Sequence, residues 1–205
     1  MSSFWDEKYK GDSYLYGLEP NRFFAKNLPY CEPGSYRQKI LLPMEGEGRN
    51  AVHAAQKGWH VDAYDSSGTA RDKAGKLAGN AGVTISYALQ DVTTLVLPAA
   101  EYHAAALVYA HLDPPDRQEL HRKVMNALLP GGLLILEAFH VSQLGKESGG
   151  PRDPEKLYTV QMIRSDFPEM TFQLLEEVEI SLDEGTGHRG QASVVRALAR
   201  KELQN

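Results

Sequence analysis

The chain has 205 residues, of which 42% are hydrophobic and 24% are charged, and its formal net charge is −5. This length predicts one domain spanning residues 1–205, and the composition is that of an ordinary globular protein, which excludes disordered and fibrous classes. Because the charge is mildly acidic and the sequence contains no clustered basic face, nucleic acid is not expected as a partner.

Cysteine usage and hydropathy predict a cytoplasmic protein. Cys31 is the sole cysteine, so the chain forms no intrachain disulfide and no cysteine-based zinc cluster. The sequence has no His-x-x-x-His pair, and we expect no metal site. The first residues do not resemble a signal peptide, and no apolar run approaches the roughly 20 residues of a membrane span, so we expect no membrane partner.

Residues 1–37 are rich in aromatic side chains and in turn-forming glycines and prolines. We expect this segment to serve either as a structural wrap around the domain or as a lid over a ligand, because so many aromatic rings must bury their surface. Tyr14, Tyr16 and Gly17 lie in its least helical part and are the better lid candidates. The aromatic residues of the segment are Phe4, Trp5, Tyr9, Tyr14, Tyr16, Phe23, Phe24, Tyr30 and Tyr36.

A glycine-rich turn, Glu-Gly-Glu-Gly at residues 45–48, follows an apolar run at residues 38–43 and precedes a helical segment at residues 50–57. A strand, a glycine turn and a helix in this order are typical of nucleotide sites in doubly wound α/β folds, because glycines let the backbone approach the ligand closely. Gly-x-Gly also occurs in ordinary loops, so the turn alone leaves that alternative open.

Two expected strands end in an acid. Asp65 follows the strand expected at residues 60–64 and lies 17 residues after Gly48, where dinucleotide folds place a ribose-binding carboxylate. The alternative for Asp65 is an N-cap of the next helix. Asp91 follows the strand expected at residues 84–88, and its alternative is an ordinary turn residue.

The next two expected strands carry further polar and aromatic residues at their ends. Tyr109 and His111 lie at the end of the strand expected at residues 104–112, and His140 follows the one expected at residues 133–139. Parallel strands joined by right-handed crossovers present all their carboxyl ends at one edge, so we expect one cleft there. Its expected residues are Glu45, Gly46, Asp65, Asp91, Tyr109, His111, Phe139 and His140.

The last third of the chain differs from the first part. A polar loop is expected at residues 141–157, a short helix at residues 164–167, and two strands at residues 172–182 and 191–200 that form an antiparallel hairpin. The predicted fold class is therefore α/β: a doubly wound, Rossmann-like, seven-stranded sheet that is mostly parallel and ends in a C-terminal antiparallel hairpin.

Several short motifs together resemble one family. They are Phe4-Trp5-Asp6, Tyr14-x-Tyr16-Gly17-x-x-Pro20-Asn21, Glu45-Gly46-Glu47-Gly48-Arg49-Asn50-Ala51, Asp65, Asp91-Val92, His111-Leu112 through Arg117, Leu129-Pro130-Gly131-Gly132, and Glu184-Gly185 to Gly190 with Ala192-Ser193-Val194-Val195-Arg196. The sequence resembles the class I S-adenosylmethionine-dependent methyltransferases, and most closely the small single-domain branch that includes the tellurite-resistance and thiopurine-type enzymes.

The resemblance implies S-adenosylmethionine as cofactor and S-adenosylhomocysteine as product. It assigns the aminocarboxypropyl end of the cofactor to the glycine turn, the ribose hydroxyls to Asp65, and the neighbourhood of the sulfonium to Ala110 and His111. The cofactor-binding residues that it implies are Glu45, Gly46, Gly48, Asn50, Asp65, Asp91, Val92 and Ala110. The chain departs from the usual pattern at Leu42 and Met44, where the wider family has an acid and a further glycine.

The expected reaction is in-line methyl transfer to a small molecule such as a thiol, a metalloid or another small nucleophile, by a monomer or homodimer. A sulfonium is already an activated donor, so a general base is needed only if the acceptor arrives protonated. His111, His140 and Tyr16 are the candidate catalytic residues, and His188 is a further cleft histidine. For each histidine a purely structural role is the alternative.

Two other functions remain open at the level of the sequence. The spacing Gly46-x-Gly48-x-x-Ala51, with Asp65 after it, also fits the fingerprint of an NAD(P)-dependent oxidoreductase. A non-catalytic S-adenosylmethionine-binding protein is the second alternative, because Leu42 and Met44 alter the turn. The terminal hairpin and Asp91 favour the methyltransferase.

Overall fold

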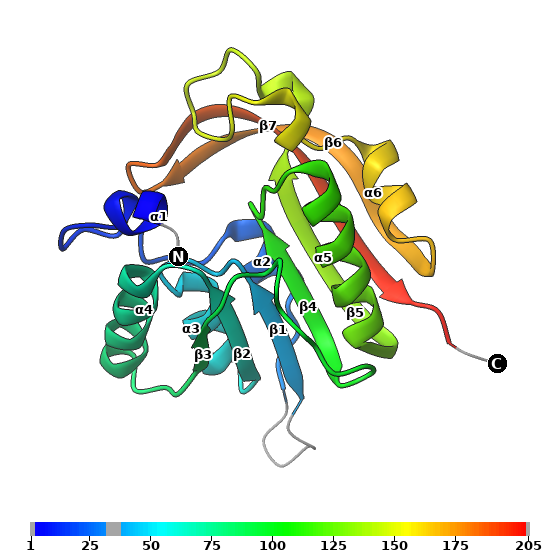
Figure 1. Ribbon diagram of the computed structural model, residues 1–205, viewed down its shortest axis with the longest axis horizontal. Coiled ribbons are helices and arrows are strands. Elements are labelled where there is room, and N and C mark those ends of the chain that lie inside the picture. The colour runs from blue at the N-terminus through cyan, green and yellow to red at the C-terminus, as the bar shows by residue number, and fades with distance from the viewer. Residues whose placement is uncertain (1–2, 32–37, 204–205) are drawn as a thin grey trace.

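The computed structural model of the protein describes residues 3–31 and 38–203, so Tyr36 of the aromatic segment lies outside the described residues. Seven strands form one sheet in the order β3-β2-β1-β4-β5-β7-β6 (Figure 1). Strands β1 to β5 are parallel, and β7 pairs antiparallel with both β5 and β6. The predicted fold class is confirmed. The strands are β1 (Lys39–Pro43), β2 (His60–Asp65), β3 (Ser86–Leu89), β4 (Tyr102–Val108), β5 (Leu128–Phe139), β6 (Met170–Glu184) and β7 (His188–Lys201).

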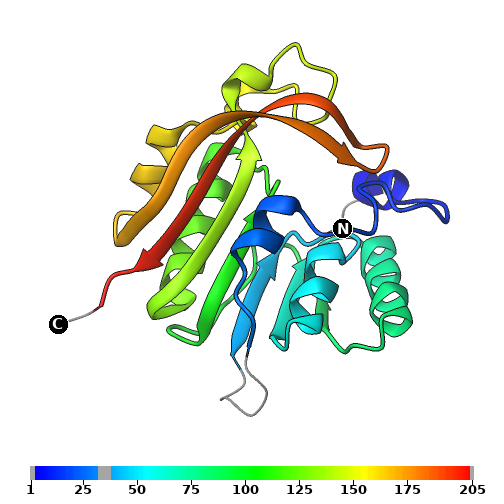
Figure 2. The same ribbon diagram turned by 180° about the vertical axis from the view of Figure 1, so that it is seen from behind.

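Helices cover both faces of the sheet. Helices α5 and α6 lie on the face seen in Figure 1, whereas α2 and α3 lie on the opposite face, seen in Figure 2. No helix in the described ranges is long and apolar enough to cross a membrane. The helices are α1 (Ser3–Lys8), α2 (Arg22–Asn27), α3 (Arg49–Gln56), α4 (Gly68–Asn80), α5 (Pro114–Ala127) and α6 (Val160–Asp166), with the short 3₁₀ helices η1 (Val141–Gln143) and η2 (Pro154–Lys156).

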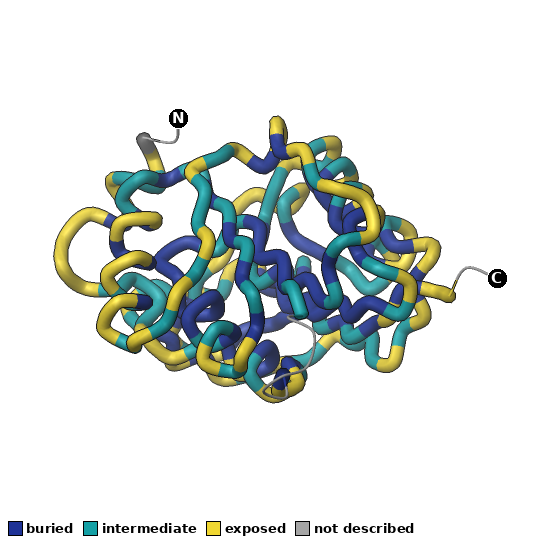
Figure 3. The backbone as a smooth tube through the Cα atoms, turned by 90° about the horizontal axis from the view of Figure 1, so that it is seen from below, coloured by how far each residue is buried: buried dark blue, intermediate teal, exposed yellow. Residues whose placement is uncertain are grey.

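The hydrophobic core is divided by the sheet into two main clusters. Alternate residues of the central strands point to opposite faces. Leu41 and Leu134 therefore pack under α5 and α6, whereas Ile40 and Ile135 pack under α2 and α3. Figure 3 shows buried backbone through the middle of the molecule and exposed backbone at its rim. A core on both faces explains why the central strands are apolar throughout and do not alternate.

One predicted strand ends earlier than expected. The strand expected at residues 104–112 stops at Val108. Tyr109 has a φ of 53°, in the left-handed region, which breaks the extended conformation. His111 therefore lies in the loop before α5 and not on the strand. This turn could not be predicted from the residue type, because Tyr109 is neither glycine nor asparagine.

The C-terminal hairpin is longer than predicted and reaches over the carboxyl edge of the sheet. Strands β6 and β7 pair from Met170 to Glu184, beyond the point where β5 ends at Phe139. Their free end arches toward α1 (Figures 1 and 2). There the hairpin turn contacts the N-terminal segment, because the amide of Gly187 donates to the carbonyl of Leu15 at 2.8 Å.

Candidate active site

The glycine turn and the acid after β2 form one connected unit. The amide of Gly46 donates to Asp65 Oδ2 at 3.0 Å, and the amide of Ser67 donates to Oδ1 at 2.9 Å. Gly46 and Gly48 both have positive φ values, 64° and 91°. A Cβ on Gly48 would lie 2.5 Å from the Cβ of Ala74 in α4, so this position needs glycine for packing as well as for conformation. Burial raises the pKa of the Asp65 carboxyl, while the amide of Ser67 lowers it.

Two other residues of the turn region make internal hydrogen bonds. Glu45 Oε1 accepts from the amide of Ala51 in the first turn of α3 at 2.7 Å. Burial raises the pKa of Glu45 to about 7. Asn50 Oδ1 accepts from the amide of Asn21 at 2.9 Å, which ties α3 to the N-terminal segment. Both side chains therefore stabilise the turn region through hydrogen bonds to backbone amides.

The remaining residues assigned to the cofactor lie after β3 and β4. Asp91 is exposed, and its Oδ1 accepts from the amide and the hydroxyl of Thr93 at 2.9 and 2.8 Å. These two hydrogen bonds lower the pKa of Asp91. Val92 and Ala110 are buried, and the carbonyl of Ala110 accepts from the hydroxyl of Tyr158 at 2.8 Å. The strand ends thus border one edge of the sheet, as the sequence predicts.

The N-terminal segment lies against this edge and is held there by a buried ion pair. Lys73 Nζ of α4 lies 2.6 Å from Glu47 Oε1, and it also donates to the carbonyls of Tyr9 and Ser13 at 2.9 and 2.6 Å. Glu47 Oε2 accepts from the amide of Leu15 at 2.7 Å. The lysine and the carboxylate therefore bind backbone groups of the segment. On the sequence alone, a glutamate between two glycines gave no sign of this role.

Tyr9 occupies the space beside the glycine turn. A Cβ placed on Gly46 would lie 2.9 Å from the phenol oxygen of Tyr9. Tyr9 is buried, and burial raises the pKa of its phenol, as do the nearby side chains of Tyr16 and Asp65. The segment predicted to be a wrap or a lid therefore contacts the turn directly in this structure.

The two histidines predicted to be catalytic lie in different surroundings. His111 is half-buried, and both its nitrogens have partners: Nδ1 lies 2.7 Å from the carbonyl of Lys156, and Nε2 accepts from the amide of Phe139 at 3.2 Å. Burial lowers the pKa of His111 to about 4. At His140, both Glu177 Oε1 and the amide of Ser142 lie within hydrogen-bond distance of Nδ1, which can serve only one of them at a time.

An aromatic cluster connects the N-terminal segment to the strand ends. The ring of His188 lies 4.3 Å from the ring of Tyr16 and 4.4 Å from that of Tyr109. The ring of Tyr109 lies in turn 4.7 Å from that of Phe139. His188 Nδ1 lies 3.5 Å from Glu184 Oε2. Burial lowers the pKa of His188 and raises that of Tyr16 to about 12, so both side chains are neutral at pH 7.

A buried network of charged and amide groups was not foreseen. Arg49 Nη2 pairs with Glu184 Oε2 at 2.8 Å, and Arg196 Nε pairs with Glu137 Oε2 at 2.6 Å. The Nδ2 of Asn21 donates to both carboxylates. The available signal was Glu137 itself, a charged residue in an otherwise apolar strand, because buried charges need partners.

The turn also contains one strained residue. Met44 has a φ of 56°, in the left-handed region that glycine adopts without cost. It stands where the resemblance places a further glycine. The backbone of this turn therefore keeps the conformation of a glycine while the sequence provides a methionine.

Comparison with known proteins finds one family model that matches part of the chain. Residues 42–132 match the model described as a methyltransferase domain, and the match runs from the end of β1 to the start of β5. The predicted resemblance is confirmed, and S-adenosylmethionine is the cofactor of this family. No curated protein matches the chain in sequence.

Solved structures share the fold of this chain. An S-adenosylmethionine-dependent methyltransferase from Methanosarcina mazei aligns with a TM-score of 0.68 and 17% identity, covering 91% of this chain and 100% of that chain. TehB from Haemophilus influenzae aligns with a TM-score of 0.66 and 17% identity, covering 82% and 59%. A protein from a study of the conversion of a disulfide bond into a thioacetal group during echinomycin biosynthesis aligns at 0.71 and 16%, covering 98% and 92%. At these identities the likeness concerns the fold alone.

Metal ligands do not gather in the described part of the chain. Within residues 3–31 and 38–203, no three His, Cys, Asp or Glu side chains are grouped so as to hold a metal ion.

Proposed function

We propose that this protein transfers the methyl group of S-adenosylmethionine to a small-molecule acceptor by in-line displacement. The acceptor class is a soft nucleophile, such as a thiolate or a reduced metalloid. We place the protein in the cytoplasm, where its single cysteine stays reduced, and propose that it acts as a monomer or homodimer.

The observation that carries the proposal is the hydrogen bond between Gly46 and Asp65, which joins the glycine turn and the strand-end acid into one unit. Each Asp65 oxygen accepts one amide hydrogen, and a carboxylate has about four acceptor positions, so capacity remains for the ribose hydroxyls. The glycine turn would hold the aminocarboxypropyl group. Asp91 and Val92 would contact the adenine, and the backbone of Ala110 would lie near the sulfonium.

The chemistry asks mainly for positioning and for the exclusion of water. When bound, the cofactor supplies an activated methyl group on a sulfonium. The protein has to hold the acceptor in line with that methyl group and keep water away from the cation. The aromatic cluster of Tyr16, Tyr109, Phe139 and His188 supports this role, because it forms an apolar wall beside the strand ends.

The state of the histidines supports a soft acceptor. His111 has both nitrogens engaged inside the protein, and burial lowers the pKa of His111, His140 and His188 below the usual value. A histidine with a lowered pKa is a weak base. An acceptor that arrives already deprotonated, as a thiolate does, needs none.

Calorimetry followed by a transfer assay tests the proposal. We expect S-adenosylmethionine and S-adenosylhomocysteine to bind and NAD not to bind. We then expect radiolabelled methyl groups to move to thiol, selenol or metalloid acceptors more readily than to amines or alcohols. Absence of binding to both sulfur compounds would contradict the methyltransferase proposal. Binding of NAD alone would favour an oxidoreductase, and binding without transfer to any acceptor would favour a non-catalytic protein.

Three substitutions test two of the predicted catalytic residues, His140 and Tyr16, and the further cleft histidine His188 once an acceptor is found. For a thiolate acceptor, His140→Gln, His188→Gln and Tyr16→Phe should each lower kcat by less than about 10-fold, because general acid–base catalysis typically contributes 10²-fold or more and is not used here. His111→Gln serves as a comparison for a purely structural histidine. A loss above 100-fold in one variant, with cofactor affinity unchanged, would identify that residue as a base and overturn the soft-acceptor assignment.

A further inference from the structure

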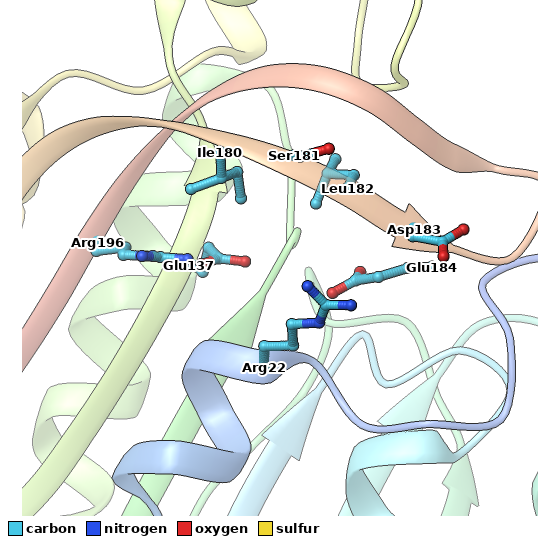
Figure 4. Close-up of a pocket in the computed structure, with 8 residues that line it drawn as sticks. All are labelled: Arg22, Glu137, Ile180, Ser181, Leu182, Asp183, Glu184 and Arg196. Atoms are coloured by element: carbon cyan, nitrogen blue, oxygen red, sulfur yellow. Dashed lines mark hydrogen bonds and ion pairs between the residues drawn. The ribbon is translucent and has the colours of Figure 1, made fainter.

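A cavity lies beneath the arch of β6, and no residue assigned to the cofactor lines it. It has a volume of about 310 Å³ and lies between the end of β6, the start of α2 and the end of β5 (Figure 4). This volume is at the lower end of the range for small-molecule sites. Its lining residues are Arg22, Glu137, Ile180, Ser181, Leu182, Asp183, Glu184 and Arg196.

The two buried carboxylates of the cavity each have an arginine partner and further donors. Glu137 accepts from Asn21 Nδ2 at 2.6 Å, from the hydroxyl of Tyr109 at 2.8 Å and from Arg196 Nε at 2.6 Å. Glu184 accepts from Arg49 Nη2 at 2.8 Å and from Asn21 Nδ2 at 3.2 Å, and His188 lies at 3.5 Å. Neither carboxylate therefore calls for a cationic ligand.

The guanidinium groups of the cavity, by contrast, have N–H donors that make no hydrogen bond with the described residues. Arg22 makes no hydrogen bond or ion pair with any residue in the ranges 3–31 and 38–203, and Figure 4 shows it extending from α2 toward Glu184. Arg196 uses Nε on Glu137, while its two Nη groups make no hydrogen bond within the same described ranges. Arg49 pairs with Glu184 and Arg196 pairs with Glu137, so both buried acids of the cavity have a cation other than Arg22. The third acid of the lining, Asp183, is exposed and forms no ion pair with Arg22.

The wall opposite the arginines is apolar. Ile180 and Leu182 lie on β6 above Arg22 (Figure 4). Successive residues of a strand point to opposite sides, so the side chains of Ser181 and Asp183 are directed away from Ile180 and Leu182. The cavity thus combines unpaired guanidinium donors on one side with branched aliphatic side chains on the other.

We propose that this cavity binds a small aliphatic carboxylate. The carboxylate would accept hydrogen bonds from Arg22 and from the free Nη groups of Arg196, since a guanidinium matches the planar geometry of a carboxylate. The hydrocarbon part would lie against Ile180 and Leu182. This assignment is independent of methyl transfer, because it rests on a cavity that none of the cofactor residues line.

The test is an NMR titration of the ¹⁵N-labelled protein without S-adenosylmethionine. The probes are 4-methylpentanoate, the uncharged 4-methylpentanamide and inorganic phosphate. We expect 4-methylpentanoate to shift the amides of residues 180–184 and to bind at least 10-fold more tightly than either other probe. Equal binding of 4-methylpentanamide would overturn the role of the arginines. Equal binding of phosphate would overturn the role of the aliphatic side chains. Shifts of amides elsewhere in the protein would overturn the location of the site.

Arg22→Gln gives the matched variant, because Arg22 is exposed and makes no contact that its loss would break among the described residues. We expect it to weaken 4-methylpentanoate binding at least 10-fold, and Arg22→Lys to weaken it less. Arg152→Gln, which changes an exposed arginine outside the cavity, should leave binding unchanged. Full affinity in Arg22→Gln would overturn the proposal. Arg196 is a poorer choice, because its removal would leave Glu137 without its cation.

Discussion

One half of the carboxyl edge is formed by β1, β2 and β3. The residues of this half that we assign to the cofactor contact partners close to them in the chain. Gly46 and Asp65 are 19 positions apart, and Asp91 and Thr93 are two apart. In the half formed by β5, β6 and β7, Arg49 pairs with Glu184 across 135 positions. The first half is assembled from strand ends, whereas the second exists only after the hairpin has folded over the N-terminal segment.

This difference corresponds to two proposed functions, cofactor binding and the selection of another small molecule. The half formed by β1, β2 and β3, which we call the cofactor half, contains the strand, glycine turn and acid that the match to the methyltransferase domain covers. This arrangement suits a cofactor that stays the same whatever the acceptor is. The long-range half borders the aromatic cluster and the cavity beneath β6, where an acceptor or another small molecule would be selected. The N-terminal segment joins the halves, because Glu47 binds it on one side and Gly187 on the other.

The largest effect on stability is expected at the ion pair that binds the N-terminal segment to the cofactor half. Lys73→Met should lower the free energy of unfolding by about 3–5 kcal/mol, because it leaves Glu47 as an uncompensated buried charge. Urea unfolding measures this cost. Lys76→Met, an exposed lysine on the same helix, should cost less than about 0.5 kcal/mol. Equal costs for the two variants would show that the ion pair does not hold the segment.

The next effect concerns the acid of the cofactor half. Asp65→Ala should weaken S-adenosylmethionine binding by about 1–3 kcal/mol, the usual cost of losing a charged hydrogen-bond partner. Calorimetry measures the change, with Asp72→Ala on the exposed side of α4 as control. An unchanged affinity in Asp65→Ala would mean that the cofactor binds elsewhere.

The pH dependence of stability tests the burial of the glycine turn. Burial raises the pKa of Glu45 from 4.5 to about 7, so between these values the folded protein holds a proton that the unfolded chain has lost. The contribution of Glu45 to stability is therefore present below pH 4.5 and is lost as the pH rises through 7. Relative to the wild type, Glu45→Gln should gain about 3 kcal/mol across this window. Urea unfolding at pH 4.5 and pH 8 measures it, and a constant difference between the proteins would contradict the assignment.

The smallest effect tests the strained turn. Met44→Gly should be more stable than Met44→Ala by about 1 kcal/mol, because both lose the side chain and only glycine adopts a φ of 56° without cost. At Met125, inside α5, the order should reverse, because glycine is the poorer helix former. Thermal unfolding of the four variants measures both differences. An alanine advantage at both positions would show that Met44 is unstrained.

The cofactor half could be predicted from the sequence because its signals are local. Each expected strand, the glycine turn and Asp65 came from a pattern a few residues long, and the structure brings them together at one edge. The common edge of the strand ends followed from the handedness of parallel crossovers.

The other half could not be predicted for a physical reason. The roles of Arg49 and Asn21 depend on Glu184 and Glu137, which lie more than 100 positions away. The place of His111 after a strand predicts a candidate base, and its nitrogens are engaged by backbone groups that no periodicity reveals. The residue roles at this edge therefore remain predictions until a ligand is bound.

The central claim is that S-adenosylmethionine binds at the carboxyl edge of β1, β2, β3 and β4. Its most direct test is an NMR titration of the ¹⁵N-labelled protein with the stable product S-adenosylhomocysteine. We expect shifts of the amides of Gly46, Gly48, Ser66, Val92 and Ala110, with residues 180–183 unaffected. Saturable shifts confined to residues 180–183, or none at any concentration, would contradict the claim.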